Sequence, residues 1–97
     1  MKVTRAHLER TRTILDRAIN DAIQRKGDEA FASPHEALGV ITEEQFELVE
    51  AVQSNSKESI KMELLDVAIS TIWEVASMLA REDEDTKETR EVKKKKT

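Results

Sequence analysis

Two pairs of acidic residues lie at equal distances on either side of a short polar segment at residues 54–56. Glu47 and Glu63 are each eight residues from the middle of this segment. Glu44 and Asp66 are each eleven residues from it. Each residue of a helix rises about 1.5 Å, so equal counts on the two arms of an antiparallel helical hairpin mean equal heights. Residues three apart also share a helix face, so we predict a hairpin that gathers the four carboxylates in one cluster.

The composition favours helices over strands. Charged residues make up 37% of the chain and aromatic residues 3%, with two Gly and one Pro among 97 residues. Strands are usually rich in aromatic and β-branched residues, and turns are rich in Gly and Pro. We therefore predict an all-α fold. A chain of this length forms at most one domain with a modest core.

The spacing of apolar residues predicts three helices, at residues 3–26, 34–53 and 57–81. The second has the clearest start, with Ser33 as the N-cap, Pro34 as the first helical residue and Glu36 completing a capping box. Residues 82–97 contain one apolar side chain and cannot bury enough surface to fold independently. We expect this charged tail to be flexible or to extend the third helix, and we assign residues 1–81 to one helical domain.

Several of the clustered acids are expected to be buried. The third helix is apolar on nearly all sides, as is typical of a buried helix. Its remaining arc carries Glu63, Asp66, Ser70, Glu74 and Ser77. On the second helix, Glu44 falls inside the apolar arc and Glu47 lies at its edge. An unpaired buried charge is costly, so we expect a cation in the cluster. A solvated acidic face and neutralisation by Arg side chains of the first helix are the two alternatives.

The third helix also predicts an assembly of more than one chain. Two other helices from a 97-residue chain cannot cover every side of it. Phe46 points away from the apolar arc of the second helix, which indicates a subunit contact. We therefore expect at least a homodimer, with the third helices and Phe46 near the interface and the acidic cluster close to it.

The donor atoms narrow the choice of metal. Carboxylate oxygens suit hard cations such as Mg²⁺, Mn²⁺ or Ca²⁺, and the cluster has no His or Cys to favour zinc. Mg²⁺ usually keeps several waters and completes its coordination with substrate phosphates. We therefore expect phosphate chemistry with Mg²⁺, or Mn²⁺ as a substitute. Glu43 is adjacent and less buried, so it is a candidate to position the attacking water or to hold a second ion, and an ordinary solvated Glu is an equally good interpretation.

Composition and charge disfavour several other classes of function. The absence of Cys excludes disulfides, thiolate metal sites and catalysis by a Cys nucleophile. A net charge of −4 does not indicate a protein that binds duplex DNA. The sequence has no apolar stretch typical of a signal peptide, and no apolar run approaches the length of a membrane span. We expect a cytoplasmic protein with no membrane partner and no specific nucleic-acid partner.

The acidic pairs also carry a resemblance to a known family. EEQFE at residues 43–47 is followed after fifteen residues by ELLD at residues 63–66, which matches the EExxE…ExxD pattern of the MazG-like all-α nucleotide pyrophosphohydrolases. The resemblance covers about residues 30–80. It implies an all-α homodimer or homotetramer that hydrolyses a nucleoside triphosphate to the monophosphate and pyrophosphate with Mg²⁺. By position, it implies an assisting carboxylate at Glu43 and metal ligands at Glu44, Glu47, Glu63 and Asp66.

Two other interpretations of the motif stay open. Phosphoribosyl-ATP pyrophosphohydrolases resemble the same motif, but they usually have lysines just ahead of the Glu pair, where this chain has GVIT at residues 39–42. Many MazG-like relatives also carry basic or Asn residues downstream of the second motif that hold the nucleotide, and here that region is the charged tail. A non-catalytic helical oligomerisation module with a relic metal site is therefore the second alternative.

Overall fold

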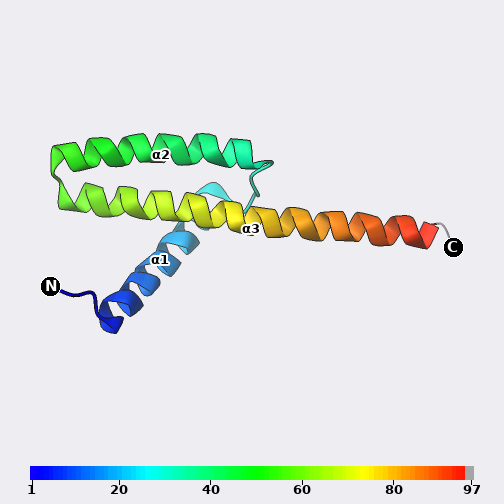
Figure 1. The fold of residues 1–97 in the computed structure, drawn as a ribbon, viewed down its shortest axis with the longest axis horizontal. Coiled ribbons are helices and arrows are strands. Elements are labelled where there is room, and N and C mark those ends of the chain that lie inside the picture. Colours follow the sequence, from blue (N-terminus) through cyan, green and yellow to red (C-terminus); the bar gives the residue numbers. More distant parts are fainter. Residues whose placement is uncertain (96–97) are drawn as a thin grey trace.

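The chain folds into three helices joined by two short connections. The computed structural model describes the backbone of residues 1–95 and the side chains of residues 1–88. In order, the helices are α1 (Arg5–Lys26), α2 (Pro34–Ser54) and α3 (Lys57–Lys95) (Figure 1). No strand occurs within the described backbone, so the predicted all-α class is confirmed.

The helices α2 and α3 form an antiparallel hairpin, and they lie side by side along the whole of α2 (Figure 1). Asn55 ends α2 in the left-handed conformation, with φ of 60°, and its N–H donates to the carbonyl of Val52 at 3.1 Å. Asn tolerates this conformation better than most residues. The hydroxyl of Ser56 then accepts the N–H of Ser59 at 3.3 Å, which caps the start of α3. The chain therefore reverses direction at residues 54–56, the polar segment that lies midway between the two acidic pairs.

The N-terminal ends of α1 and α2 are both capped by side chains. The hydroxyl of Ser33 accepts the N–H of Glu36 at 3.2 Å, with Pro34 following the cap as predicted. The structure shows this half of the expected capping box, without the return bond from the Glu36 side chain. The full reciprocal pair is found on α1, where the backbones and side chains of Thr4 and His7 bond to each other. His7 is thereby assigned a capping role.

The connection between α1 and α2, residues 27–33, is held against α3 by polar side chains of that helix. The polar stripe of α3 is the arc formed by Glu63, Asp66, Ser70, Glu74 and Ser77. The buried hydroxyl of Ser77 accepts the N–H of Phe31 at 3.0 Å and donates to the carbonyl of Trp73 at 2.7 Å. Arg81 donates to the carbonyl of Phe31 at 2.6 Å. Its second terminal nitrogen, Nη2, donates to both carboxylate oxygens of Glu74, at 2.9 and 3.0 Å. This end of the stripe is therefore satisfied by the protein itself.

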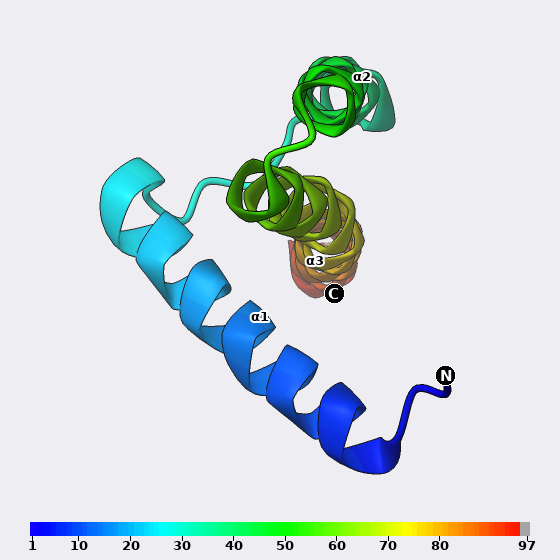
Figure 2. The ribbon, with the colours of Figure 1, turned by 90° about the vertical axis from the view of Figure 1, so that its left-hand side faces the viewer.

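Trp73 and Gly27 fix the other end of the same connection. The indole N–H of Trp73 donates to the carbonyl of Glu29 at 2.8 Å. Gly27 ends α1 with φ of 87° and ψ of −172°, a conformation essentially restricted to glycine. These contacts redirect the chain between α1 and α2. As a result α1 packs against α3 alone and diverges from the hairpin toward its N-terminus (Figure 2).

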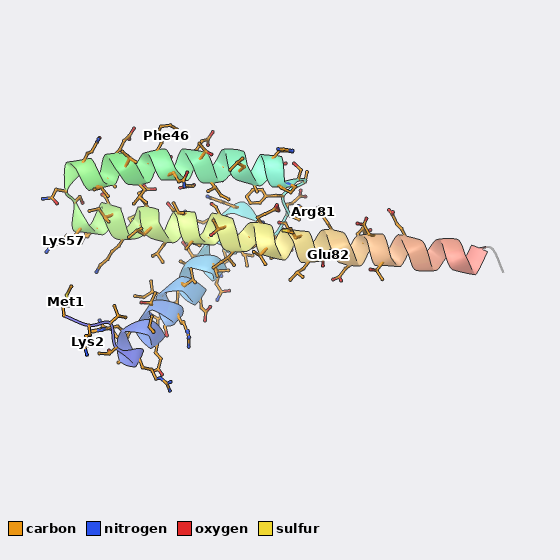
Figure 3. The ribbon with its side chains drawn as sticks, viewed as in Figure 1. Met1, Lys2, Phe46, Lys57, Arg81 and Glu82 are labelled. Atoms are coloured by element: carbon orange, nitrogen blue, oxygen red, sulfur yellow. The ribbon has the colours of Figure 1, made fainter. Side chains whose placement is uncertain are left out.

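The isolated chain has a very small core. Among the described residues, the only buried hydrophobic side chains are Ala37 and Ala51, and the only buried polar ones are Ser70 and Ser77. Small residues of this kind let helices approach closely, but they bury little apolar area. Large apolar side chains stay exposed on all three helices, and Phe46 points away from α3 (Figure 3). Several large apolar side chains of α3 therefore remain exposed in a single chain.

The helix α3 does not end near Arg81, as expected from the helix pattern, but continues to Lys95. This is the helix-extension alternative for the charged tail, whose last two residues lie outside the described part of the chain. The extension runs beyond the end of the hairpin without a neighbouring helix from the same chain (Figure 1). Within the residues that the structure describes, no helix is both long and apolar enough to cross a membrane.

Candidate metal centre

The hairpin brings the four predicted acids together. Glu44 and Glu47 come from α2, and Glu63 and Asp66 come from α3. One carboxylate oxygen from each residue can be chosen so that all four oxygens lie within 4.8 Å of one another. The equal spacing about the turn therefore places the pairs at matching heights, as predicted. We call these four residues the acidic cluster.

Two oxygens of the acidic cluster are buried without a partner. The Oε2 atoms of Glu44 and Glu63 are almost inaccessible, and neither has a hydrogen-bond partner in the protein. A buried charged oxygen without a partner is strongly unfavourable. Glu47 is exposed, so the cluster is open to solvent on one side. This arrangement suits a cation that completes its coordination with water or with a ligand.

The electrostatics of the acidic cluster are unfavourable without a cation. Burial raises the pKa of Glu44 above its ordinary value of 4.5, and the negative charges of Asp66, Glu47 and Glu63 raise it further. Lys26 partly opposes this shift. Burial also raises the pKa of Glu63, followed by the charges of Glu47 and Asp66. A divalent cation would lower the pKa of both Glu44 and Glu63, because its positive charge favours the ionised carboxylates.

The raised pKa values predict how the metal-free fold depends on pH. A carboxyl group whose pKa is higher in the folded state holds its proton better when folded, so its ionisation destabilises the fold. In the presence of a chelator, stability should therefore fall as the pH rises from about 4.5 through the raised pKa values of Glu44 and Glu63. Thermal unfolding at a series of pH values would measure this fall. A Glu44→Gln, Glu63→Gln variant should lack it, and parallel profiles for the two proteins would contradict the assignment.

The two alternatives to a cation find little support in the structure. The ion pairs found among the described side chains are Arg25–Asp21 at 3.0 Å and Arg81–Glu74 at 2.9 Å, and neither involves the acidic cluster. Neutralisation by arginines of α1 is therefore not seen. The buried oxygens also distinguish the cluster from an ordinary solvated acidic face. The cationic residue whose charge acts on Glu44 is Lys26, at the end of α1.

Glu43 lies outside the acidic cluster. It is exposed on α2, and its oxygens are not among the four that approach one another. Glu43 is next to Glu44 but on the solvent side. It is therefore better placed to contact a water bound to an ion than to contact the ion itself. Its assisting role therefore stays a prediction.

A pocket of about 300 Å³ adjoins the acidic cluster at Glu44. Its lining comes from all three helices and the α1–α2 connection: Ala22, Ile23, Lys26, Gly27, Glu29, Phe31, Val40, Glu44, Ile69, Ser70 and Trp73. The sequence indicated Ser70 through its position on the polar stripe of α3. It did not indicate Lys26 or Phe31, because their place depends on the path of the α1–α2 connection. The pocket therefore lies beside the acidic cluster and is bordered by all three helices and the α1–α2 connection.

Comparison of the chain with protein-family models, curated proteins and solved structures finds no match. The MazG-like resemblance therefore continues to rest on the motif residues, together with the geometry that the hairpin gives them.

Proposed function

We propose that this chain is a Mg²⁺-dependent nucleotide pyrophosphohydrolase that cleaves a nucleoside triphosphate to the monophosphate and pyrophosphate. The observation that carries the proposal is the acidic cluster, with its two buried and unpartnered oxygens beside a pocket. Carboxylate-only donors favour a hard cation, and such cations bind phosphate oxygens. The MazG-like motif at residues 43–47 and 63–66 supports the same reaction.

The acids have distinct roles in this proposal. Glu44, Glu63 and Asp66 would hold a cation from the less exposed side of the site, and Glu47 would hold it from the open side. A bound cation supplies charge stabilisation at the phosphoryl oxygens and lowers the pKa of a coordinated water. Glu43 would orient a water from the solvent side. No protein nucleophile is required, which agrees with a site built from carboxylates alone.

The pocket supports a nucleotide as the substrate class. Its volume of about 300 Å³ is at the lower end of the range for small-molecule sites. Trp73 and Phe31 give it aromatic surface, and Trp73 is held in place by its bond to Glu29. Aromatic side chains stack on nucleobases without requiring one particular base. Lys26 is the cation of the pocket lining and is placed to meet phosphate charge next to Glu44.

A panel of standard and modified nucleoside triphosphates, assayed for pyrophosphate release with Mg²⁺ or Mn²⁺, tests the proposal. Release of pyrophosphate and the monophosphate in equal amounts is the expected result. Phosphoribosyl-ATP belongs in the panel, because activity confined to it would favour that related enzyme. If cations stabilise the protein but no compound in the panel is cleaved, the acidic cluster is a structural cation site in a non-catalytic module.

Lys26→Gln should weaken nucleotide binding more than it affects the chemical step. The substitution removes one positive charge from the pocket, and a charged hydrogen bond to phosphate contributes enough to predict an increase in KM of about tenfold. Steady-state kinetics would measure KM and kcat separately. Arg25→Gln is the matched control, because Arg25 is the adjacent residue and its charge pairs with Asp21 instead. Equal effects of the two substitutions would mean that Lys26 contributes only general charge.

A further inference from the structure

We propose that Ser70 is a specificity-determining residue of the pocket, and that its hydroxyl forms a hydrogen bond with a hydroxyl group on the sugar of the nucleotide. This inference rests on the proposed function, because it names a contact that holds the middle of the same substrate. Ser70 belongs to the polar stripe of α3, four residues after Asp66 and three before Trp73. It lies outside both the acidic cluster and the motif at residues 43–47 and 63–66.

The side chain of Ser70 is buried, at 8% exposed, yet its hydroxyl has no hydrogen-bond partner among the residues that the structure describes. Neighbouring hydroxyls of α3 donate to carbonyls about one turn earlier, Ser77 to Trp73 at 2.7 Å and Thr71 to Ala68 at 2.8 Å. Buried hydroxyls in folded proteins are normally paired. The hydroxyl of Ser70 is therefore left for water or a bound molecule to satisfy.

The pocket gives access to this hydroxyl. Ser70 is part of the pocket lining, together with Trp73 and with Glu44 of the acidic cluster. Among the described side chains, the inaccessible oxygens without a partner belong to Glu44 and Glu63, and not to Ser70. The Ser70 hydroxyl therefore retains some accessible surface. Because the residue is otherwise buried and lines the pocket, a molecule bound in the pocket would be able to reach it there.

The position of Ser70 along α3 indicates the sugar as the part of the nucleotide that it contacts. Asp66 of the acidic cluster precedes Ser70 by about 6 Å along the helix axis, and Trp73 follows it by about 4.5 Å. At about 100° per residue, the three side chains fall within an arc of about 60°. In a nucleotide the sugar joins the phosphates to the base. With the phosphates at the cation and the base against Trp73, the sugar lies beside Ser70.

A hydroxyl in such a position discriminates between ligands. A sugar hydroxyl that bonds to Ser70 satisfies both groups, whereas an analogue without that hydroxyl leaves Ser70 unpaired in the pocket. One net hydrogen bond between neutral groups corresponds to a preference of about fivefold to tenfold in Kd. Ser70→Ala should remove this preference and keep the fold, because alanine is similar in size and brings no unpaired polar group.

Calorimetric titration with two nucleotides measures the preference. The probes are α,β-imido triphosphates of the nucleoside that the panel shows to be cleaved fastest, one with ribose and one with dideoxyribose, each with Mg²⁺. The imido bridge prevents hydrolysis, so binding is measured apart from activity. The dideoxyribose-to-ribose ratio of Kd values should be about fivefold to tenfold smaller in Ser70→Ala than in the natural protein. Thr71→Ala is the matched control and should leave the ratio unchanged, because Thr71 is adjacent but exposed, and its hydroxyl bonds within α3.

The outcomes separate this inference from the proposed function. An equal ratio in Ser70→Ala and the natural protein, with both nucleotides still bound, would overturn the role of Ser70 and leave the proposed function standing. A natural protein that neither cleaves nor binds any nucleotide would overturn both. Thermal unfolding without nucleotide gives a further check, since the melting temperature of Ser70→Ala should not fall below that of the natural protein. A large fall would show that the hydroxyl is paired within the protein, which would also overturn the inference.

Discussion

Glu47→Gln and Glu63→Gln are each expected to reduce pyrophosphate release by at least about a hundredfold. Either substitution replaces a charged ligand of the cation by a neutral amide, which weakens metal binding and the stabilisation of charge on the transferring phosphoryl group. Helix content should be nearly unchanged, because removing one negative charge relieves repulsion within the acidic cluster. Initial rates at saturating Mg²⁺ and circular dichroism would measure the two properties.

Glu58→Gln is a suitable control for these variants. Glu58 lies on the same helix as Glu63, but it is exposed and does not belong to the acidic cluster. Its substitution should leave the rate within about twofold of the natural protein, since an exposed charge outside the cluster is weakened by solvent and salt. If Glu58→Gln were as damaging as Glu63→Gln, the loss would reflect general charge rather than metal ligation, and the site assignment would fail.

Divalent cations should raise the melting temperature of this protein substantially. Only the folded hairpin gathers the four acids, so a cation binds the folded state and stabilises it by mass action. At ten times the Kd the gain is about 1.4 kcal/mol, which corresponds to a rise of about 6–11 °C in a domain of this size. Thermal unfolding with and without Mg²⁺ or Mn²⁺, after removal of bound metal by a chelator, would measure it.

The rise should disappear in a Glu44→Gln, Asp66→Asn double variant. These substitutions remove two charges from the less exposed part of the acidic cluster while keeping the shapes of the side chains. In the absence of metal the variant should be at least as stable as the natural protein, because the repulsion that raises the pKa of Glu44 is reduced. An undiminished rise with Mg²⁺ in this variant would place the ion elsewhere on the chain.

The hairpin and the acidic cluster could be predicted from the sequence because both depend on local counting. The cap at Ser33 and the break at residues 54–56 fix the ends of α2, and helical periodicity fixes which side chains share a face. Equal distances from the turn then set the heights of Glu44 and Asp66. No knowledge of distant contacts was needed for this part of the structure.

The pocket could not be predicted in the same way. Its position depends on bonds between residues far apart in the sequence, such as Trp73 to Glu29 and Arg81 to Phe31. Helical periodicity does not reveal which backbone groups a polar side chain will meet across that separation. Glu74 illustrates the difficulty, since it belongs to the same polar stripe as Asp66 but pairs with Arg81 rather than joining the cluster. The direction of α1 follows from these contacts, so it could not be predicted from helical periodicity either.

The end of α3 was left open between a flexible tail and a helix extension for a different reason. Composition shows that residues 82–97 cannot bury a core, but a polar helix does not need to bury one when it continues from a stable helix. The costly nucleation step has already been completed by residues before Arg81. Propagation then adds one hydrogen bond for each further residue, which is enough to carry the helix to Lys95.

The acidic cluster and the pocket differ in how far apart their residues lie along the chain. The cluster is contained between Glu44 and Asp66, within a single hairpin, whereas the pocket joins Ala22 to Trp73. Short-range contacts form sooner during folding, because less loop entropy is lost in closing them. The hairpin would therefore assemble its cation site before α1 docks and the pocket exists. A cation that binds these four acids would therefore stabilise the hairpin without requiring that α1 has docked.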